Sequence, residues 1–278
     1  MKTEFTISPP AGLARMNWPE LWRYRDLFLV MAWRDISVRY KQTALGVSWA
    51  VLQPVVTMVI FTFIFNRMAG IQSGDETPYP IFLYTGQIFW LYFSGTLSNA
   101  SQSMVTNAGL VQKIYFPRLI IPAAAAVTGL VDFAIALIIL VGMMLWYGFA
   151  PGWVGLATFP VLLLTGVLSA MGMGLLLAAI NVKYRDVRYA LPFLISTLMF
   201  VTPVIYPVSL LNGYPWAKTA MIWLNPISGV ISNARAGLLG QTGFDWPVLW
   251  ISLLMSIVYL VIGLRVFRST ERYFADIA

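Results

Sequence analysis

Six long apolar stretches constrain this chain more than any other feature of its sequence. Each approaches or exceeds the roughly 20 mostly apolar residues that an α-helix needs to cross the hydrocarbon of a bilayer. Only 10% of the 278 residues are charged, against about 25% in soluble domains. We therefore predict an all-α integral membrane protein with six transmembrane helices. The predicted spans are Leu45–Phe65, Ile81–Gln102, Leu119–Trp146, Val154–Ile180, Ala190–Tyr206 and Trp246–Leu264.

Basic residues fall mainly on one side of these predicted spans. An even number of spans puts both termini on one side, and the other side then carries only Arg67, Lys218 and Arg235. Cytoplasmic loops are enriched in lysine and arginine, so both termini are predicted to be cytoplasmic. The positive-inside distribution then explains the net charge of +7 without a nucleic-acid partner. The side with the termini carries Lys2, Arg15, Arg23, Arg25, Arg34, Arg39, Lys41, Lys113, Arg118, Lys183, Arg185, Arg188, Arg265, Arg268 and Arg272.

The part before the first span predicts an amphipathic helix. Apolar residues recur there at helical spacing, with basic residues beside them, as in a helix that lies along the cytoplasmic membrane interface. Acids at Asp26 and Asp35 favour a protein partner on this surface over a simple membrane anchor. The apolar stripe consists of Trp22, Leu29, Trp33, Ile36 and Tyr40. The predicted division is a flexible cytoplasmic tail (1–18), the interface helix (19–44), the transmembrane domain (45–267) and a cytoplasmic C-terminal tail (268–278).

The connection between the fifth and sixth spans is too apolar for a solvated loop. Gly213, Pro215 and Pro226 divide it into pieces too short to cross a bilayer, and such pieces are usually re-entrant or interfacial. We predict two short re-entrant helices from the outer side, Trp216–Leu224 and Ile227–Leu239. A single seventh span is the alternative, but it would put the basic C-terminal segment outside, against the charge count.

The second span carries a polar stripe about five turns long, with apolar Leu91 at one position of the same face. Small polar residues often hold membrane helices together, and the alternative is the wall of a hydrated path. The stripe consists of Tyr84, Gln87, Ser94, Ser98, Ser101 and Gln102.

Several kinds of chemistry are excluded or weakly supported. The chain has no histidine and no cysteine, so zinc sites of the usual kind, cysteine nucleophiles and histidine bases are absent. It has no phosphate-binding loop of the Walker type. Asp132 lies near the middle of the third span, where an acid either takes part in a proton relay or is paired in a polar interface. Asp75 and Glu76 alone do not make a catalytic site. We predict that the chain is not an enzyme.

Four stretches together resemble a known family. They are "RDISVRYKQTALGVSWAVLQP", "LVQKIYFPRLIIP", "NVKYRDVRY", and "TPVIYP" followed by "NPIS". They resemble the membrane subunits of ABC-2 type transporters, within the branch that exports O-antigen, capsule or teichoic-acid chains. The resemblance covers about Asp26 to Arg268.

This resemblance implies partners and contact regions. It implies a homodimer in the bacterial inner membrane with two ABC ATPase subunits below it, and a channel at the dimer interface for a glycan linked to a lipid such as undecaprenyl diphosphate. This chain would bind no cofactor, since ATP and magnesium would sit on the partner ATPase. The implied ATPase contacts are an interface helix within Glu20–Arg25 and a coupling helix within Asn107–Lys113, with contact residues Glu20, Arg23, Arg25, Asn107, Leu110 and Lys113.

A channel for a glycan needs polar groups for the sugar hydroxyls and aromatic rings for the sugar faces. The alternative for every aromatic residue is the interfacial belt of membrane proteins. A proton-coupled flippase, for which Asp132 is the only indication, and a membrane-embedded transferase are the competing functions. Our hypothesis for the lining is Tyr40, Trp49, Tyr84, Gln87, Ser94, Ser98 and Tyr206, with Trp90 and Tyr92 as alternates.

Overall fold

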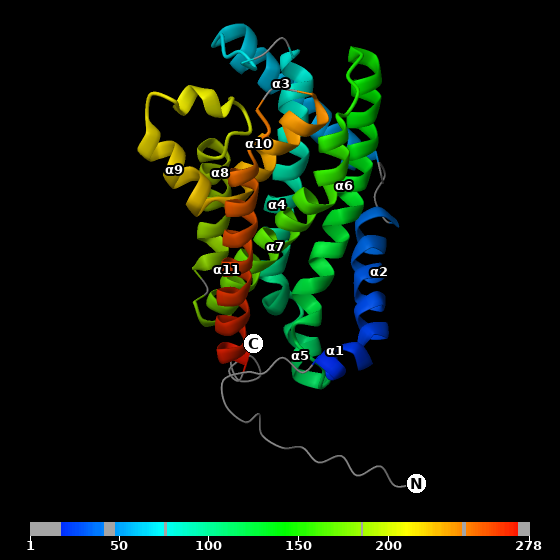
Figure 1. Ribbon diagram of the computed structural model, residues 1–278. Coiled ribbons are helices and arrows are strands. Elements are labelled where there is room, and N and C mark those ends of the chain that lie inside the picture. Colours follow the sequence, from blue (N-terminus) through cyan, green and yellow to red (C-terminus); the bar gives the residue numbers. More distant parts are fainter. Residues whose placement is uncertain (1–17, 42–47, 75–76, 185, 241–242, 272–278) are drawn as a thin grey trace.

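The computed structural model describes residues 18–41, 48–74, 77–184, 186–240 and 243–271. Every regular element in these ranges is a helix (Figure 1). The predicted N-terminal tail up to residue 17, the start of the first span at Leu45, the acids Asp75 and Glu76, and the tail beyond residue 271 lie outside the described residues. The elements are α1 (Trp18–Arg23), α2 (Arg25–Lys41), α3 (Ser48–Phe61), η1 (Thr62–Met68), α4 (Tyr79–Thr106), α5 (Ala108–Lys113), α6 (Ile120–Tyr147), α7 (Trp153–Lys183), α8 (Val187–Val201), η2 (Val208–Leu211), α9 (Pro215–Leu224), α10 (Pro226–Leu238) and α11 (Trp246–Thr270).

Four helices in the described part of the chain are long and apolar enough to cross a membrane. They are α3 continued through η1, α6, α7 and α11. The all-helical prediction is therefore confirmed, and the chain is a multi-pass membrane protein. The count of six stays a prediction, because α4 is 28 residues long but carries many polar residues, and α8 has only 15 residues.

Helix α8 is shorter than the predicted span Ala190–Tyr206. Its last residue is Val201, and Thr202 already has an extended backbone with ψ of 138°. Thr202 precedes Pro203, and the residue before a proline is disfavoured in the α conformation. The chain therefore leaves the helix there.

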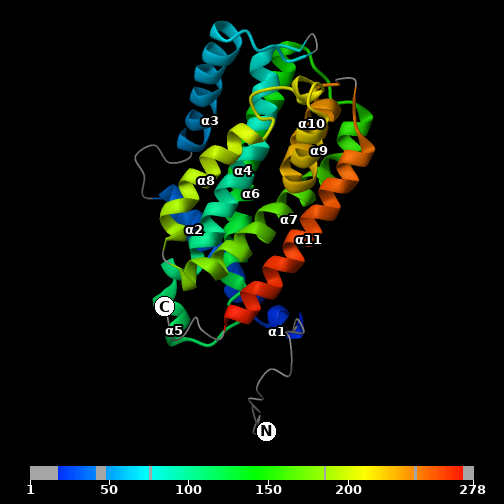
Figure 2. The ribbon, with the colours of Figure 1, turned by 90° about the vertical axis from the view of Figure 1, so that its left-hand side faces the viewer.

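Helix α4 forms the centre of the bundle. Helices α6, α7 and α10 pack around it (Figures 1 and 2). Its first three turns are completely buried from Ile81 to Trp90, in a cluster that also takes in Phe133, Leu162 and Ile227.

The predicted helices between the last two spans exist as α9 and α10, and their bounds agree with the prediction to within one residue. Each begins at a proline, which has no backbone N–H to satisfy and a φ suited to the first helical turn. Helix α10 is almost entirely buried and packs against α4, α7 and α11. The re-entrant position of the two helices in a membrane stays a prediction.

The predicted interface helix differs from the structure. It is divided at Tyr24 into α1 and α2, and α2 runs beside the first half of α6 (Figure 1). Met31 is buried in a cluster with Ile120 and Ile121 at the start of α6, while the far end of α2 reaches Asp132, near the middle of α6. Helix α2 therefore runs alongside α6 (Figure 1), and its expected position along the membrane surface stays a prediction.

The predicted stripe on this helix is nevertheless largely exposed in the single chain. Trp22 and Trp33 are each 70% exposed and Leu29 is 60% exposed. The face that packs on α6 carries Met31 and Ala32 instead.

Candidate functional site

The residues expected to contact an ATPase gather at one end of the bundle. Helices α1 and α5 lie there, beside the end of α11 (Figure 1). The Tyr115 hydroxyl, just after α5, donates a hydrogen bond to Glu20 Oε1 in α1 at 3.3 Å. Arg34 Nη2 of α2 donates to Asn107 Oδ1 at 3.0 Å. The two predicted contact regions, far apart in sequence, therefore form one connected surface.

Within this surface the predicted contact residues differ in exposure. Arg23, Arg25 and Lys113 are exposed and available to a partner. Leu110 packs inward against a buried cluster. Asn107 precedes α5, and its Nδ2 donates to the carbonyl of Ser103 at 2.8 Å, which fixes the corner between α4 and α5.

A further contact ties the same end together. Arg118, before α6, donates a hydrogen bond to the backbone carbonyl of Glu271, after α11. Burial raises the pKa of the Glu271 carboxyl, although the positive charges of Arg118 and Arg268 act in the opposite direction. This contact links the start of α6 to the end of α11.

The single acid of the third predicted span is paired. Arg39 and Tyr40 of α2 both donate hydrogen bonds to the carboxylate of Asp132 in α6. Tyr40, a predicted channel residue, is thus committed to this contact. The structure therefore agrees with the second interpretation of Asp132, a paired acid in a polar interface between helices.

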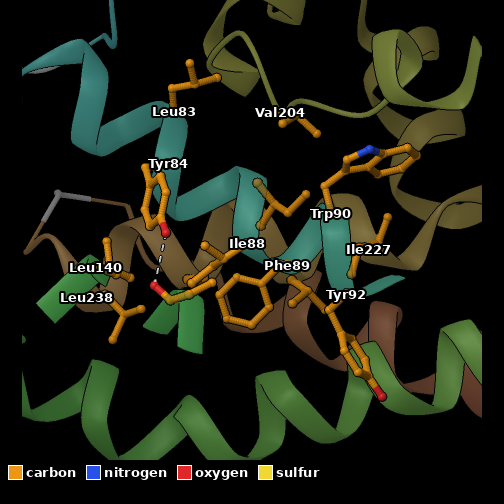
Figure 3. Close-up of a cluster of buried hydrophobic side chains, with 14 of the residues drawn as sticks. Leu83, Tyr84, Ile88, Phe89, Trp90, Tyr92, Leu140, Val204, Ile227 and Leu238 are labelled. Atoms are coloured by element: carbon orange, nitrogen blue, oxygen red, sulfur yellow. Dashed lines mark hydrogen bonds between the residues drawn. The ribbon is translucent and has the colours of Figure 1, made fainter. Parts of the chain in front are cut away.

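The polar stripe of α4 divides into two halves. The first half is covered: the Tyr84 hydroxyl donates to the carbonyl of Ala136 in α6 at 3.2 Å (Figure 3), and Gln87 Nε2 donates to the carbonyl of Pro54 in α3 at 3.1 Å. The two alternates are buried as well, since Trp90 packs against Phe93 and Tyr92 packs against Phe133. All four side chains are therefore buried within the single chain.

The second half of the stripe is accessible in the single chain except at Ser101, which is buried and donates to the carbonyl of Ser98 at 2.8 Å. Gln102 Nε2 donates to Ser98 Oγ at 3.3 Å, and Ser94 Oγ donates to the carbonyl of Leu91 at 3.4 Å. A side chain at Gly95 would meet no atom within 4 Å. Gly95 and Asn99 belong to this face but were missed, although both lie at helical spacing from Leu91. We call this set the open stripe: Leu91, Ser94, Gly95, Ser98, Asn99 and Gln102.

The two remaining predicted lining residues lie apart from the stripe. Trp49, near the start of α3, is 59% exposed. The Tyr206 hydroxyl donates to the carbonyls of Phe200 and Val201 at 3.2 and 3.0 Å. Tyr206 thus satisfies backbone groups that the end of α8 leaves free.

Sequence reasoning counted Arg235 only as a charge on the outer side, but it occupies a special position. Its guanidinium, in α10, is fully buried and donates to the carbonyls of Phe82, Pro203 and Val204. It also lies over the Phe82 ring, 3.6 Å from the ring centre. An arginine within an apolar predicted re-entrant helix was the signal that could have identified it.

Comparison with known proteins agrees with this architecture. A family model described as "ABC-2 type transporter" matches residues 26–239. The O-antigen export system permease protein RfbA of Myxococcus xanthus is 27% identical over 257 residues, covering 92% of this chain and 97% of that protein. RfbA of Klebsiella pneumoniae is 26% identical, covering 91% and 95%, and the polysialic acid transport protein KpsM of Escherichia coli is 24% identical, covering 86% and 91%. The chain therefore belongs to the ABC-2 type transporter family, as a membrane subunit that leaves ATP hydrolysis to a separate subunit.

Proposed function

We propose that this chain is the channel-forming membrane subunit of an ATP-driven exporter, which moves a lipid-linked polysaccharide from the cytoplasmic side across the bacterial inner membrane. O-antigen is the favoured substrate, because two relatives that match nearly the whole chain are named as O-antigen export permeases. Undecaprenyl diphosphate is the proposed lipid carrier. ATP and magnesium would bind to the partner ATPase and not to this chain.

The open stripe of α4 is the observation that carries the proposal. A hydrated glycan cannot enter hydrocarbon, because its hydroxyls would lose their hydrogen bonds to water. Ser94, Ser98, Asn99 and Gln102 offer such hydroxyls alternative partners along a little more than two turns of one helix. The small side chains, with Gly95 among them, leave room for a wide polymer.

The open stripe supplies only one wall, so we propose that a second copy of the chain supplies the other. The exposed apolar residues of the chain would then be divided between lipid and the dimer contact. Tyr84, Gln87, Trp90 and Tyr92 would lie behind the wall and hold α4 in place, while Tyr40, Trp49 and Tyr206 lie outside the open stripe. In this arrangement α4 and α8 are the second and fifth of six spans, α9 and α10 re-enter from the outer side, and both termini are cytoplasmic.

Two ATPase subunits would dock on the surface formed by α1 and α5. Arg23, Arg25 and Lys113 are exposed there, and Glu20 and Asn107 link this surface to neighbouring helices. Binding of ATP by the partner would shift the dimer between closed and open states. The contact between Arg34 and Asn107 gives that shift a route from α5 to α2.

Export in membrane vesicles that contain the chain and its ATPase subunit tests this function. Ser94→Leu with Ser98→Leu fills the open stripe with apolar bulk and should abolish ATP-dependent glycan export, while assembly with the ATPase remains normal. Gly142→Leu is a matched control, because that position of α6 is exposed and a Cβ there meets no atom within 4 Å. Normal export by the double variant, or export without the ATPase subunit, would refute the proposal.

A further inference from the structure

A polar pocket lies at the end of the molecule opposite α1 and α5. It has a volume of about 330 Å³ and is bounded by η2, α9, α10 and the start of α11. Figure 1 shows α9 and α10 near this end. The side chains that matter for its chemistry are Asn212, Lys218, Ser228, Ser232, Arg235 and Asp245.

The pocket concentrates positive charge. Lys218 and Arg235 are two of the three basic residues that the charge count assigns to the outer side, and both line this one pocket. Within the described ranges, neither forms an ion pair with a carboxylate. Arg235 is held by neutral backbone carbonyls, and Lys218 Nζ donates to the neutral Asn212 Oδ1 at 3.3 Å.

Among the described residues that line the pocket, the single acid has another role. Asp245 precedes α11, and its Oδ1 accepts a hydrogen bond from the backbone N–H of Val248 at 3.1 Å. This is an N-cap, which satisfies a backbone donor that the first helical turn leaves free. Two cations and one committed carboxylate give the described part of the pocket wall a net positive charge.

A buried hydroxyl in the same wall is without a partner. Ser228 is 1% exposed, and its Oγ has no hydrogen-bond partner in the described part of the chain. Buried polar atoms are almost always hydrogen-bonded, because leaving one unpaired costs free energy. Beside two cations, this hydroxyl fits a ligand that carries acceptor oxygens.

We propose that this pocket binds the phosphate group of a lipid, either a membrane phospholipid or the phosphate-linked carrier of the glycan. Phosphate oxygens accept charge-assisted hydrogen bonds from lysine and arginine, and Ser228 would supply a further donor. The site would hold a phosphate group at the outer end of the chain. The proposal goes beyond export itself, because binding here needs neither ATP nor the ATPase.

Lipid binding to the purified full chain tests the site directly. Native mass spectrometry would measure retention of two probes, phosphatidylglycerol and undecaprenyl phosphate, with phosphatidylcholine and undecaprenol as background. Lys218→Gln should weaken retention of the bound lipid about tenfold, the factor expected for losing a hydrogen bond from a charged group. Arg67→Gln is the matched control, because it removes the third outer cation, which does not line the pocket.

Two further points keep the result decisive. Arg235 is left unchanged, since its replacement would leave three buried carbonyls without their donor. If Lys218→Gln assembles poorly, Ser228→Ala serves as a second variant, and it should reduce lipid retention less than Lys218→Gln. The site is supported if Lys218→Gln loses lipid retention while Arg67→Gln retains lipid as the unmodified chain does. The probe that the unmodified chain retains identifies the source of the phosphate. Retention of neither probe, or an equal loss in Arg67→Gln, would overturn the proposal.

Discussion

Replacing Asp132 with asparagine tests the contact that holds α2 against α6. The carboxylate accepts hydrogen bonds from Arg39 and Tyr40, so the Asp132→Asn substitution leaves the arginine without its counter-ion. Breaking a fully buried ion pair costs about 3–5 kcal/mol, whereas an exposed pair contributes only about 0–1 kcal/mol. The Arg39 and Asp132 side chains are 37% and 35% exposed, so an intermediate value of about 2 kcal/mol is expected.

This cost can be measured by thermal unfolding of the purified chain at a fixed scan rate. A loss of about 2 kcal/mol corresponds to a decrease in Tm of about 4–8 °C for a chain of this size class. A double-mutant cycle with Arg39→Gln isolates the pair from other effects of each substitution. The double variant should be less destabilised than the sum of the two single variants, by about 1 kcal/mol or more.

A further variant separates the two donors. Tyr40→Phe removes one hydrogen bond to a charged acceptor and keeps the ring, so it should cost about 1.5 kcal/mol. Strict additivity of Arg39→Gln and Asp132→Asn, within about 0.5 kcal/mol, would show that the two side chains do not interact. The placement of α2 along α6 would then be refuted.

Three other predictions follow from particular contacts. Gly263→Ala should lower Tm by several degrees, because a Cβ there meets the Gly172 carbonyl where α7 and α11 touch; Gly142→Ala, which meets no atom within 4 Å, should leave Tm unchanged. The stability of the folded chain should decrease as pH rises from the ordinary glutamate pKa through the raised pKa of Glu271, because burial favours the protonated carboxyl. The Tm of Glu271→Gln, measured across the same pH range, should not show this decrease. Lys113→Glu should reduce the amount of ATPase subunit that co-purifies, while Lys183→Glu, an equally exposed charge reversal at the end of α7, should not.

Local signals in the sequence were sufficient for several elements. The prolines at Pro215 and Pro226 mark the first residues of α9 and α10, so the predicted and observed bounds nearly coincide. Proline also explains the main error in length, because Pro203 ends α8 at Val201. A hydropathy window extends through Pro203, since it registers apolar character and not the backbone conformation that the proline imposes.

The position of α2 could not be found in this way. The spacing of Leu29 and Trp33 places them on one face of α2, but that face is exposed, and the helix packs through Met31 and Ala32. The contact that fixes its direction joins Arg39 to Asp132 across more than ninety residues of sequence. A pattern within one helix carries no information about such a partner.

The polar stripe of α4 shows the same limit at the candidate site. Tyr84 and Gln87 lie on the same helical face as Ser94 and Ser98, as their spacing predicts. Ala136 of α6 and Pro54 of α3 cover only the first half of that face. The periodicity of α4 therefore defines the face, whereas its neighbours α3 and α6 decide which half remains free to contact a second chain or a substrate. Two side chains can confirm that division. Gln87 is hydrogen-bonded to α3 and Ser94 is not, so removal of α3 should expose Gln87 and leave the exposure of Ser94 unchanged.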